Sequence, residues 1–399
     1  MILSRLRTNL DFMPSPVRDR PGLLIRDSYR YSDATLIIPP LLVRGLEFFD
    51  GVRTDADMHA ELTRLVGGSE IGNAVPNLVN ALRDAGFLED ETYAKLKECR
   101  HSSFAQSPVR EAVHAGSAYP AEADPLRTVM QKYLGGVAST HEGLVGIAAP
   151  HVSPEGGWQS YRAAYQWLTP DLGDRTFVVL GTSHYGEPDK FGLTRKPFET
   201  PFGKTKTDDA LVSELARQPA SLMEDYCHSI EHSIEFQVVF LQSIYGPDVR
   251  ILPILCGSFA RSIYQGGMPE DNDSVKRFLS SLGEIAARET DRLFWVLGVD
   301  MAHMGVRYGD SFSAFADRDE MAAVKERDQL RIERVKASDA RGFWELVKEN
   351  QDDLKWCGSS PIYSFLKVMP KARGTLHRYE QWNIDDRSVV SFAGISFCG

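Results

Sequence analysis

Cysteine is scarce in this 399-residue sequence, which contains five cysteines and no C-x-x-C pair. A disulfide framework needs an even and denser set, and a zinc knuckle needs closely spaced pairs, so the sequence supports neither. No apolar run approaches the roughly 18 residues of a membrane span, and the start of the sequence has no apolar core of secretory-signal length. We therefore expect a cytoplasmic protein without a membrane partner.

Basic residues are also fewer than acidic ones. The sequence contains 45 lysines and arginines and 55 aspartates and glutamates, which gives a formal net charge of −10. Binding to a phosphate backbone depends on clustered basic side chains, so we expect no nucleic-acid partner. The sequence does contain 43% hydrophobic and 25% charged residues, the balance of a soluble globular protein. Its length suits two domains, or one α/β domain with an appendage.

Residues 1–105 have their own pattern of apolar residues and turns. The predicted strands and helices are 22–27, 35–40, 55–66 and 71–85. A break is predicted between the two helices at the "GGS" of 67–69, and a linker at the polar stretch 99–111. This order predicts a small winged-helix-like α+β module, or an α+β cap packed on the main body. The pattern resembles the winged-helix peptide-recognition modules found with radical S-adenosylmethionine enzymes, which implies docking of a peptide or protein.

Residues 106–399 alternate between strand and helix patterns. Apolar runs too short and too β-branched or aromatic for free helices predict buried strands at "LVGIAAP", "RTFVVLGTS", "VRILPILCG" and "RLFWVLGVD". The predicted helices are 207–217, 231–245, 274–288 and 318–336. Two further strands, "ARGTLHRYE" and "SVVSFAGISF", are expected to form an antiparallel pair at an edge. The expected fold class is therefore α/β, with a mostly parallel sheet flanked by helices.

Three of these predicted strands end in loops that carry histidine. His151 follows the first strand, His184 follows the second, and His303 follows the last one together with Asp300. Ligand sites of open α/β sheets lie beyond the carboxyl ends of the strands. The three histidines therefore predict a metal site or a proton-transfer site at one edge of the sheet, although a single histidine in such a loop is more often structural.

Cys357 precedes Gly358 and a helix that is predicted to begin near Ser360, with Pro361 in its first turn. The exposed N–H groups of a helix start favour a thiolate, and a metal would deprotonate the thiol outright. Taken alone, Cys357 is also well explained as a small buried side chain with a packing role.

His228, Glu231 and His232 spell H-x-x-E-H, the inverted motif of zinc proteases when it lies on a helix. A zinc metalloprotease of this kind would use both histidines as ligands and would need a further carboxylate downstream. It would leave the strand-end histidines and Cys357 without a role. We therefore interpret this spelling as accidental.

Six short blocks occur in order from about residue 110 to Gly399. They are "HAGSAYP" (114–120), "APHVSP" (149–154), "GTSHYG" (181–186), "EHSIEFQVVFL" (231–241), "VDMAHMG" (299–305) and "CGSSPI" (357–362). Together they resemble the Memo-like family, known in bacteria as AmmeMemoRadiSam system protein B. Such proteins are structurally related to class III extradiol dioxygenases, in which non-heme iron uses O₂ to cleave an aromatic ring. The resemblance implies that fold for residues 106–399.

The resemblance also implies a metal site in which His151 and His184 are imidazole ligands and Cys357 takes the third position. Non-heme iron that activates O₂ usually has two histidines and a carboxylate, and thiolate is a softer ligand than carboxylate. Fe²⁺ is the expected cofactor, with copper and zinc as alternatives.

Four further residues take catalytic positions in this resemblance. His232 is the expected acid and base toward a substrate, and Glu231 orients it or else lies on the surface at a helix start. Asp300 and His303 match the family's "D-x-x-H" beside the metal, where Asp300 either binds the ion or orients a ligand imidazole. The expected substrate is an unknown small molecule such as an aromatic diol. The alternative is a non-catalytic metal-handling or peptide-binding partner of a radical S-adenosylmethionine system.

Overall fold

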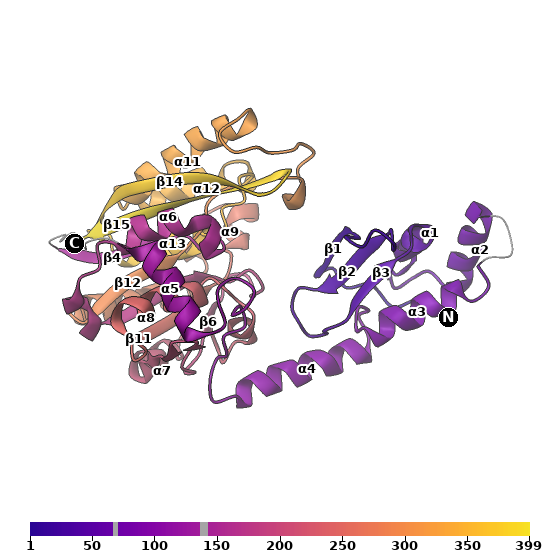
Figure 1. Cartoon of the computed structure of the whole chain (residues 1–399), viewed down its shortest axis with the longest axis horizontal. Helices are drawn as coiled ribbons and strands as arrows, with labels where there is room; N and C mark the ends of the chain where they lie inside the picture. The colour runs from indigo at the N-terminus through magenta and orange to yellow at the C-terminus, as the bar shows by residue number, and fades with distance from the viewer. Residues whose placement is uncertain (67–70, 136–142) are drawn as a thin grey trace. The chain divides into compact units, whose positions relative to one another are not determined.

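The computed structural model describes residues 1–66, 71–135 and 143–399. The chain separates into two compact units, Met1–Gln106 and Ser107–Gly399 (Figure 1). The break that the sequence predicts at 67–69 lies outside the described residues. None of the helices in the described ranges combines the length and the apolar character that a bilayer span requires.

The small unit contains a three-stranded antiparallel sheet in the order β1–β2–β3, followed by helices. Its elements are β1 (Leu10–Pro14), β2 (Leu23–Asp27), β3 (Thr35–Ile38), α1 (Pro40–Val43), η1 (Arg44–Phe48), α2 (Asp55–Val66), α3 (Ala74–Asp84) and α4 (Glu91–Gln106). Ile25, Leu62 and Leu82 are fully buried in one cluster. Sheet and helices therefore share a hydrophobic core that belongs to this unit.

The linker predicted at 99–111 is wrong over most of its length, because α4 continues to Gln106. Phe104 is the one residue of this helix that is buried. The other residues of this helix are exposed or half-buried, and their polar composition is also typical of a loop, which is why the sequence pattern predicted a linker.

The large unit contains a ten-stranded sheet in the order β10–β6–β11–β5–β12–β4–β15–β13, in which β14 also pairs with β15 and β9 with β11. Its strands are β4 (Leu144–Ala149), β5 (Thr176–Thr182), β6 (Phe191–Leu193), β9 (Lys206–Thr207), β10 (Ser221–Met223), β11 (Arg250–Cys256), β12 (Leu293–Gly298), β13 (His303–Gly305), β14 (Arg373–Asp385) and β15 (Ser388–Cys398). A separate two-stranded sheet pairs β7 (Glu199–Thr200) with β8 (Gly203–Lys204).

This sheet is mixed rather than mostly parallel. The four strands predicted from apolar runs, β11, β5, β12 and β4, are parallel neighbours. By contrast β15 is antiparallel to β4, β13 and β14, and β6 is antiparallel to β11. The α/β class is confirmed, but β15 is not at an edge, since it lies between β4 and β14 with nearly every residue buried. A tight turn from β14 into β15 forces the antiparallel direction.

Helices cover both faces of the sheet (Figure 1). The helices of this unit are α5 (Ala123–Leu134), α6 (Pro154–Tyr165), α7 (Asp209–Leu215), α8 (Glu235–Tyr245), α9 (Ala260–Gln265), α10 (Asp273–Arg288), α11 (Glu320–Lys336), α12 (Ala340–Lys348) and α13 (Ser359–Val368), with short 3₁₀ turns η2 (Pro170–Asp174), η3 (Tyr226–Ser229), η4 (Pro269–Asp271), η5 (Val306–Tyr308) and η6 (Glu349–Gln351). Along β5, Phe177 and Val179 pack with α5, α6 and α8, whereas Val178 and Leu180 pack with α7 and α10 to α13. This alternation gives three layers and leaves the strand ends free to carry a site.

Candidate metal centre

Three neighbouring strands, β5, β12 and β4, carry the centre at their carboxyl ends. His184 follows β5, Asp300 follows β12 and His151 follows β4. His232 joins them from the loop before α8. The ligand nitrogens of His151, His184 and His232 all lie within 4.8 Å of one another, which makes them a candidate group for one metal ion.

Hydrogen bonds orient all three imidazoles in the same way. His151 Nδ1 lies 2.9 Å from the carbonyl oxygen of Gly298. His184 Nδ1 lies 3.0 Å from Oε1 of Glu231, and His232 Nδ1 lies 3.1 Å from the same oxygen. A carbonyl or carboxylate oxygen accepts, so each Nδ1–H donates and each Nε2 keeps its lone pair. Metal-binding histidines in proteins are usually oriented by such partners.

Glu231 is the residue that joins two of the three imidazoles. Its carboxylate also accepts from the main-chain N–H groups of His184 and His232, each at 2.9 Å, and of Ser233 at 3.3 Å. Burial alone would raise the pKa of Glu231, but the charges and hydrogen bonds of the two histidines hold it well below its ordinary value. Burial opposes the charged form of His184, yet Glu231 raises the pKa of that imidazole well above its usual value. The site therefore favours positive charge between these groups, and a cation would supply it.

The helix predicted at 231–245 begins at Glu235, four residues later than expected. Glu231 and His232 therefore lie in a loop, and Glu231 is buried rather than on a helix surface. The main-chain carbonyl of Glu231 accepts from Arg110 Nη2 at 2.6 Å. This tertiary bond replaces the helical one, and sequence periodicity does not reveal it.

Cys357 reaches the centre from the segment directly before α13. Its Sγ lies 3.2 Å from Nε2 of His151 and 3.8 Å from the carbonyl oxygen of Asp300. Burial raises the pKa of the Cys357 thiol, and the nearby His184 opposes that rise. A bound cation would favour the thiolate far more strongly than the helix start does.

Asp300 and His303 lie on the β12 side of the centre. Oδ1 of Asp300 accepts from the main-chain N–H of His151 at 2.9 Å, and its Oδ2 lies 3.4 Å from Nε2 of His151. Burial raises the pKa of Asp300 to about 7. His303 Nδ1 lies 2.9 Å from the Met301 carbonyl and 3.1 Å from that of Lys355, and burial lowers its pKa to about 4. His303 thus ties two loops of the centre together without joining the group of three histidines.

His228 does not belong to this group. It lies in η3, is buried, and has its Nε2 3.0 Å from the carbonyl oxygen of Gly192. The H-x-x-E-H residues therefore share no helix, and the zinc-protease arrangement is not formed.

Sequence reasoning gave no role to His114, although it begins the first of the six blocks. Its ring lies 5.7 Å from that of His232, edge to face, and its Nε2 lies 3.0 Å from the carbonyl oxygen of Ile230. Because His114 lies 116 residues before Ile230, only the block itself could have drawn attention to it.

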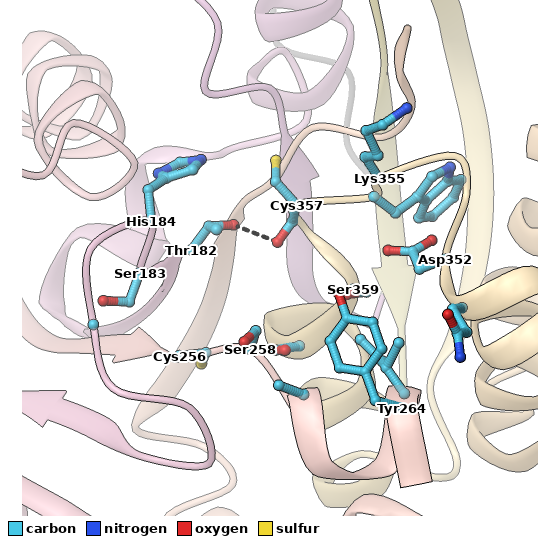
Figure 2. A pocket seen from close by; sticks show the side chains of 16 residues that line it. Thr182, Ser183, His184, Cys256, Ser258, Tyr264, Asp352, Lys355, Cys357 and Ser359 are labelled. Atoms are coloured by element: carbon cyan, nitrogen blue, oxygen red, sulfur yellow. Dashed lines mark hydrogen bonds between the residues drawn. The ribbon is translucent and has the colours of Figure 1, made fainter. Parts of the chain in front are cut away.

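A pocket of about 320 Å³ adjoins the centre at His184 and Cys357. Figure 2 shows the His184 ring and the Cys357 sulfur at one end of this pocket, with Tyr264 toward the other. Its lining also includes the hydroxyl-bearing residues Ser258 and Ser359. A small molecule held there would contact both the His184 imidazole and the Cys357 thiol.

Comparison with known proteins identifies the family of this chain. The family model described as "Memo-like protein" matches residues 110–396. A "MEMO1 family protein" of Aquifex aeolicus is 26% identical over 94% of this chain and 95% of its own length. Those of Ignicoccus hospitalis and Methanopyrus kandleri are 28% and 25% identical, each over 72% of this chain and 98% of their own lengths. The match spans nearly all of the α/β unit that carries the centre, and the chain belongs to the Memo-like family.

Proposed function

We propose that the chain is a non-heme metalloprotein that binds a transition metal at the strand-end centre and carries out oxidoreductase chemistry of the dioxygenase type on a small substrate. The observation that carries the proposal is the group of three imidazoles with ligand nitrogens within 4.8 Å of one another. Each imidazole donates its Nδ1–H to a carbonyl or carboxylate oxygen, so its Nε2 is available to an ion or to a substrate proton.

Of the groups at the centre, His151, His184 and Cys357 are the proposed ligands. Metal–nitrogen bonds of about 2.1 Å and metal–sulfur bonds of about 2.3 Å place ligand nitrogen and sulfur about 3.1–3.6 Å apart. Cys357 Sγ lies 3.2 Å from His151 Nε2, and it also interacts with His184. Two imidazoles and one thiolate fit Fe²⁺, with copper and zinc as alternatives because thiolate is soft. Iron bound there would supply electrons for dioxygen and open coordination positions.

His232 is the proposed acid and base. Its side chain is 28% exposed, against 1% for His151, so a substrate in the site can reach its Nε2. Glu231 accepts the Nδ1–H of His232 and stabilises the imidazolium that forms when Nε2 takes a proton.

Asp300 and His303 are proposed to complete the site. Asp300 holds His151 through its main-chain N–H. The Nδ1–H of His303 donates to main-chain carbonyls, so its Nε2 is an acceptor. In this tautomer the ring can accept a hydrogen bond from a substrate hydroxyl.

The pocket beside His184 and Cys357 is proposed to receive the part of the substrate that extends away from the centre, because neither His232 nor His303 lines it. Its hydroxyl-bearing lining suits a small polar molecule such as a diol, and its volume of about 320 Å³ lies at the lower end for ligand pockets.

Oxygen uptake tests the proposal. The chain purified without oxygen and loaded with Fe²⁺ should consume O₂ only when a substrate from a panel of diols is added. His232→Ala should abolish the uptake while the iron content remains, and His228→Ala should leave both unchanged. Metal-loaded protein that consumes no O₂ with any diol in the panel would contradict dioxygenase chemistry.

The second candidate is a non-catalytic metal-handling or docking partner in a radical S-adenosylmethionine system. The small unit favours it, because this unit has its own core and the Aquifex aeolicus relative matches 94% of the chain. The three-stranded antiparallel sheet followed by helices supports a winged-helix-like module that docks a peptide or protein. Binding of a peptide by metal-loaded protein without O₂ uptake would favour this candidate.

A further inference from the structure

Arg110 and Glu235 form an ion pair outside the metal centre, and both side chains are completely buried. Neither residue has a part in the chemistry proposed above. Burying an ion pair is costly, and such a pair often contributes little net stability. The contacts of the pair indicate a role other than net stability.

The guanidinium of Arg110 bonds the main chain of the loop that carries Glu231. Nε donates to the carbonyl oxygen of His228 at 2.7 Å, and Nη2 donates to that of Glu231 at 2.6 Å. Nη1 donates to the carbonyl oxygen of Glu111 at 2.8 Å and to the Glu235 carboxylate. Two nitrogens of one planar group, Nε and Nη2, thus hold both ends of the turn from residue 228 to residue 231.

The other partners fix Arg110 itself. The Glu235 carboxylate also accepts from the main-chain N–H of His114 at 3.0 Å and from the Tyr119 hydroxyl. The main-chain N–H of Arg110 donates to the carbonyl oxygen of Pro197 at 2.9 Å. Arg110 is therefore anchored on two sides, and the loop is held against a fixed point.

We propose that Arg110 is a positioning residue that sets the metal affinity of the centre. It holds the main-chain carbonyl of Glu231 so that the carboxylate of this residue stays between the two imidazoles it bonds. The inference rests on the proposed metal site and adds a residue that contacts no proposed ligand. Lysine cannot replace it, because one ammonium group lacks the planar fork that bridges three carbonyls and a carboxylate.

The test measures metal affinity in the full chain for Arg110→Lys, Glu231→Gln and the double variant. Chelator competition with Zn²⁺ gives the affinity, and the visible spectrum of the Co²⁺ form reports the coordination geometry. Asp208→Ala is the matched control, since Asp208 is a buried carboxylate bonded to Thr176 at the start of β5, whereas His184 follows the end of that strand.

Arg110→Lys should weaken Zn²⁺ binding by about 10-fold to 100-fold, the range for residues that orient metal ligands. It should also change the Co²⁺ spectrum, while Asp208→Ala lowers the melting temperature and leaves both readouts unchanged. The double variant should lose no more affinity than Glu231→Gln alone, because Arg110 acts through Glu231.

Wild-type affinity and spectrum in Arg110→Lys would overturn the inference. A double variant whose fold-loss of Zn²⁺ affinity equals the product of the two single losses would also overturn it. If Arg110→Lys does not fold, Glu235→Gln replaces it with the same expectations, and unchanged affinity there overturns the inference equally. Wild-type protein that binds no metal overturns the proposed function instead, so the two failures are distinct.

Discussion

The Sγ of Cys357 lies 3.2 Å from the Nε2 of His151, although 206 residues separate the two in sequence. His151 is placed by the end of β4 and Cys357 by the start of α13. Two distant segments therefore bring an imidazole nitrogen and a soft sulfur donor to one point.

The purified chain should contain near-stoichiometric transition metal. His151→Ala, His184→Ala and Cys357→Ala should each remove most of it, because each deletes a proposed ligand. His228→Ala should retain it, since the Nε2 of His228 bonds the Gly192 carbonyl. Elemental analysis per chain checks the result, and the reverse pattern would restore the protease interpretation.

Glu231→Gln should weaken metal binding by about 10-fold to 100-fold, because it removes the negative charge that orients His184 and His232. Chelator competition measures the change. Glu214→Gln is the control, since Glu214 forms an exposed pair with Arg288. An equal affinity for both variants would mean that Glu231 does not tune the ligands.

Gly298→Ala should lower both stability and metal affinity. A Cβ at Gly298 would lie 2.2 Å from the main-chain oxygen of Ser233, next to His232. Relief of this overlap should cost about 1–3 kcal/mol of unfolding free energy and shift the loop that carries Glu231. Gly283→Ala is the control, because a Cβ there meets no atom within 4 Å. Urea unfolding of both variants separates a local clash from a general effect of alanine.

Asp208→Ala should destabilise the metal-free chain by about 1–3 kcal/mol at pH 7, because buried donors lose their acceptor. Asp208 accepts from Leu211 N–H at 3.2 Å, Thr176 Oγ1 at 3.1 Å and Arg292 Nη1 at 2.8 Å. Burial alone would raise the pKa of Asp208, but its bonds to Arg292 and the Leu211 N–H lower it.

A lowered pKa means that the contribution of Asp208 is fully present above its unfolded value of about 3.9 and is lost as pH falls through the folded value. The difference in unfolding free energy between wild type and Asp208→Ala should therefore be constant from pH 7 to about pH 5 and shrink below about pH 4. A difference that grows on acidification would show that another group is responsible.

The sequence could predict those parts of the fold that local pattern controls. Continuous apolar runs identify β4, β5, β11 and β12 because strands covered on both faces are apolar throughout. The insertion of β15 between β4 and β14 depends on pairing across more than two hundred residues, which no local pattern contains.

The candidate site was predictable to a similar degree. His151 and His184 could be placed because ligand sites of open α/β sheets lie beyond the carboxyl ends of the strands. In the structure His232 joins these two histidines. The hydrogen bonds of the Glu231 carboxylate to two imidazoles, and that of Arg110 to the Glu231 main chain, are tertiary contacts. They could be found only once the loop before α8 had been placed.

The position of β15 also has a consequence for biosynthesis. This strand pairs with β4 through Ile395 and with β13 through Val390 and His303. The pairing with β13 needs Val390 and the pairing with β4 needs Ile395 to Cys398, so a nascent chain that already contains His151 and His184 lacks the strand that completes this side of the sheet. If the proposed metal site is correct, loading with metal would follow synthesis of the whole α/β unit.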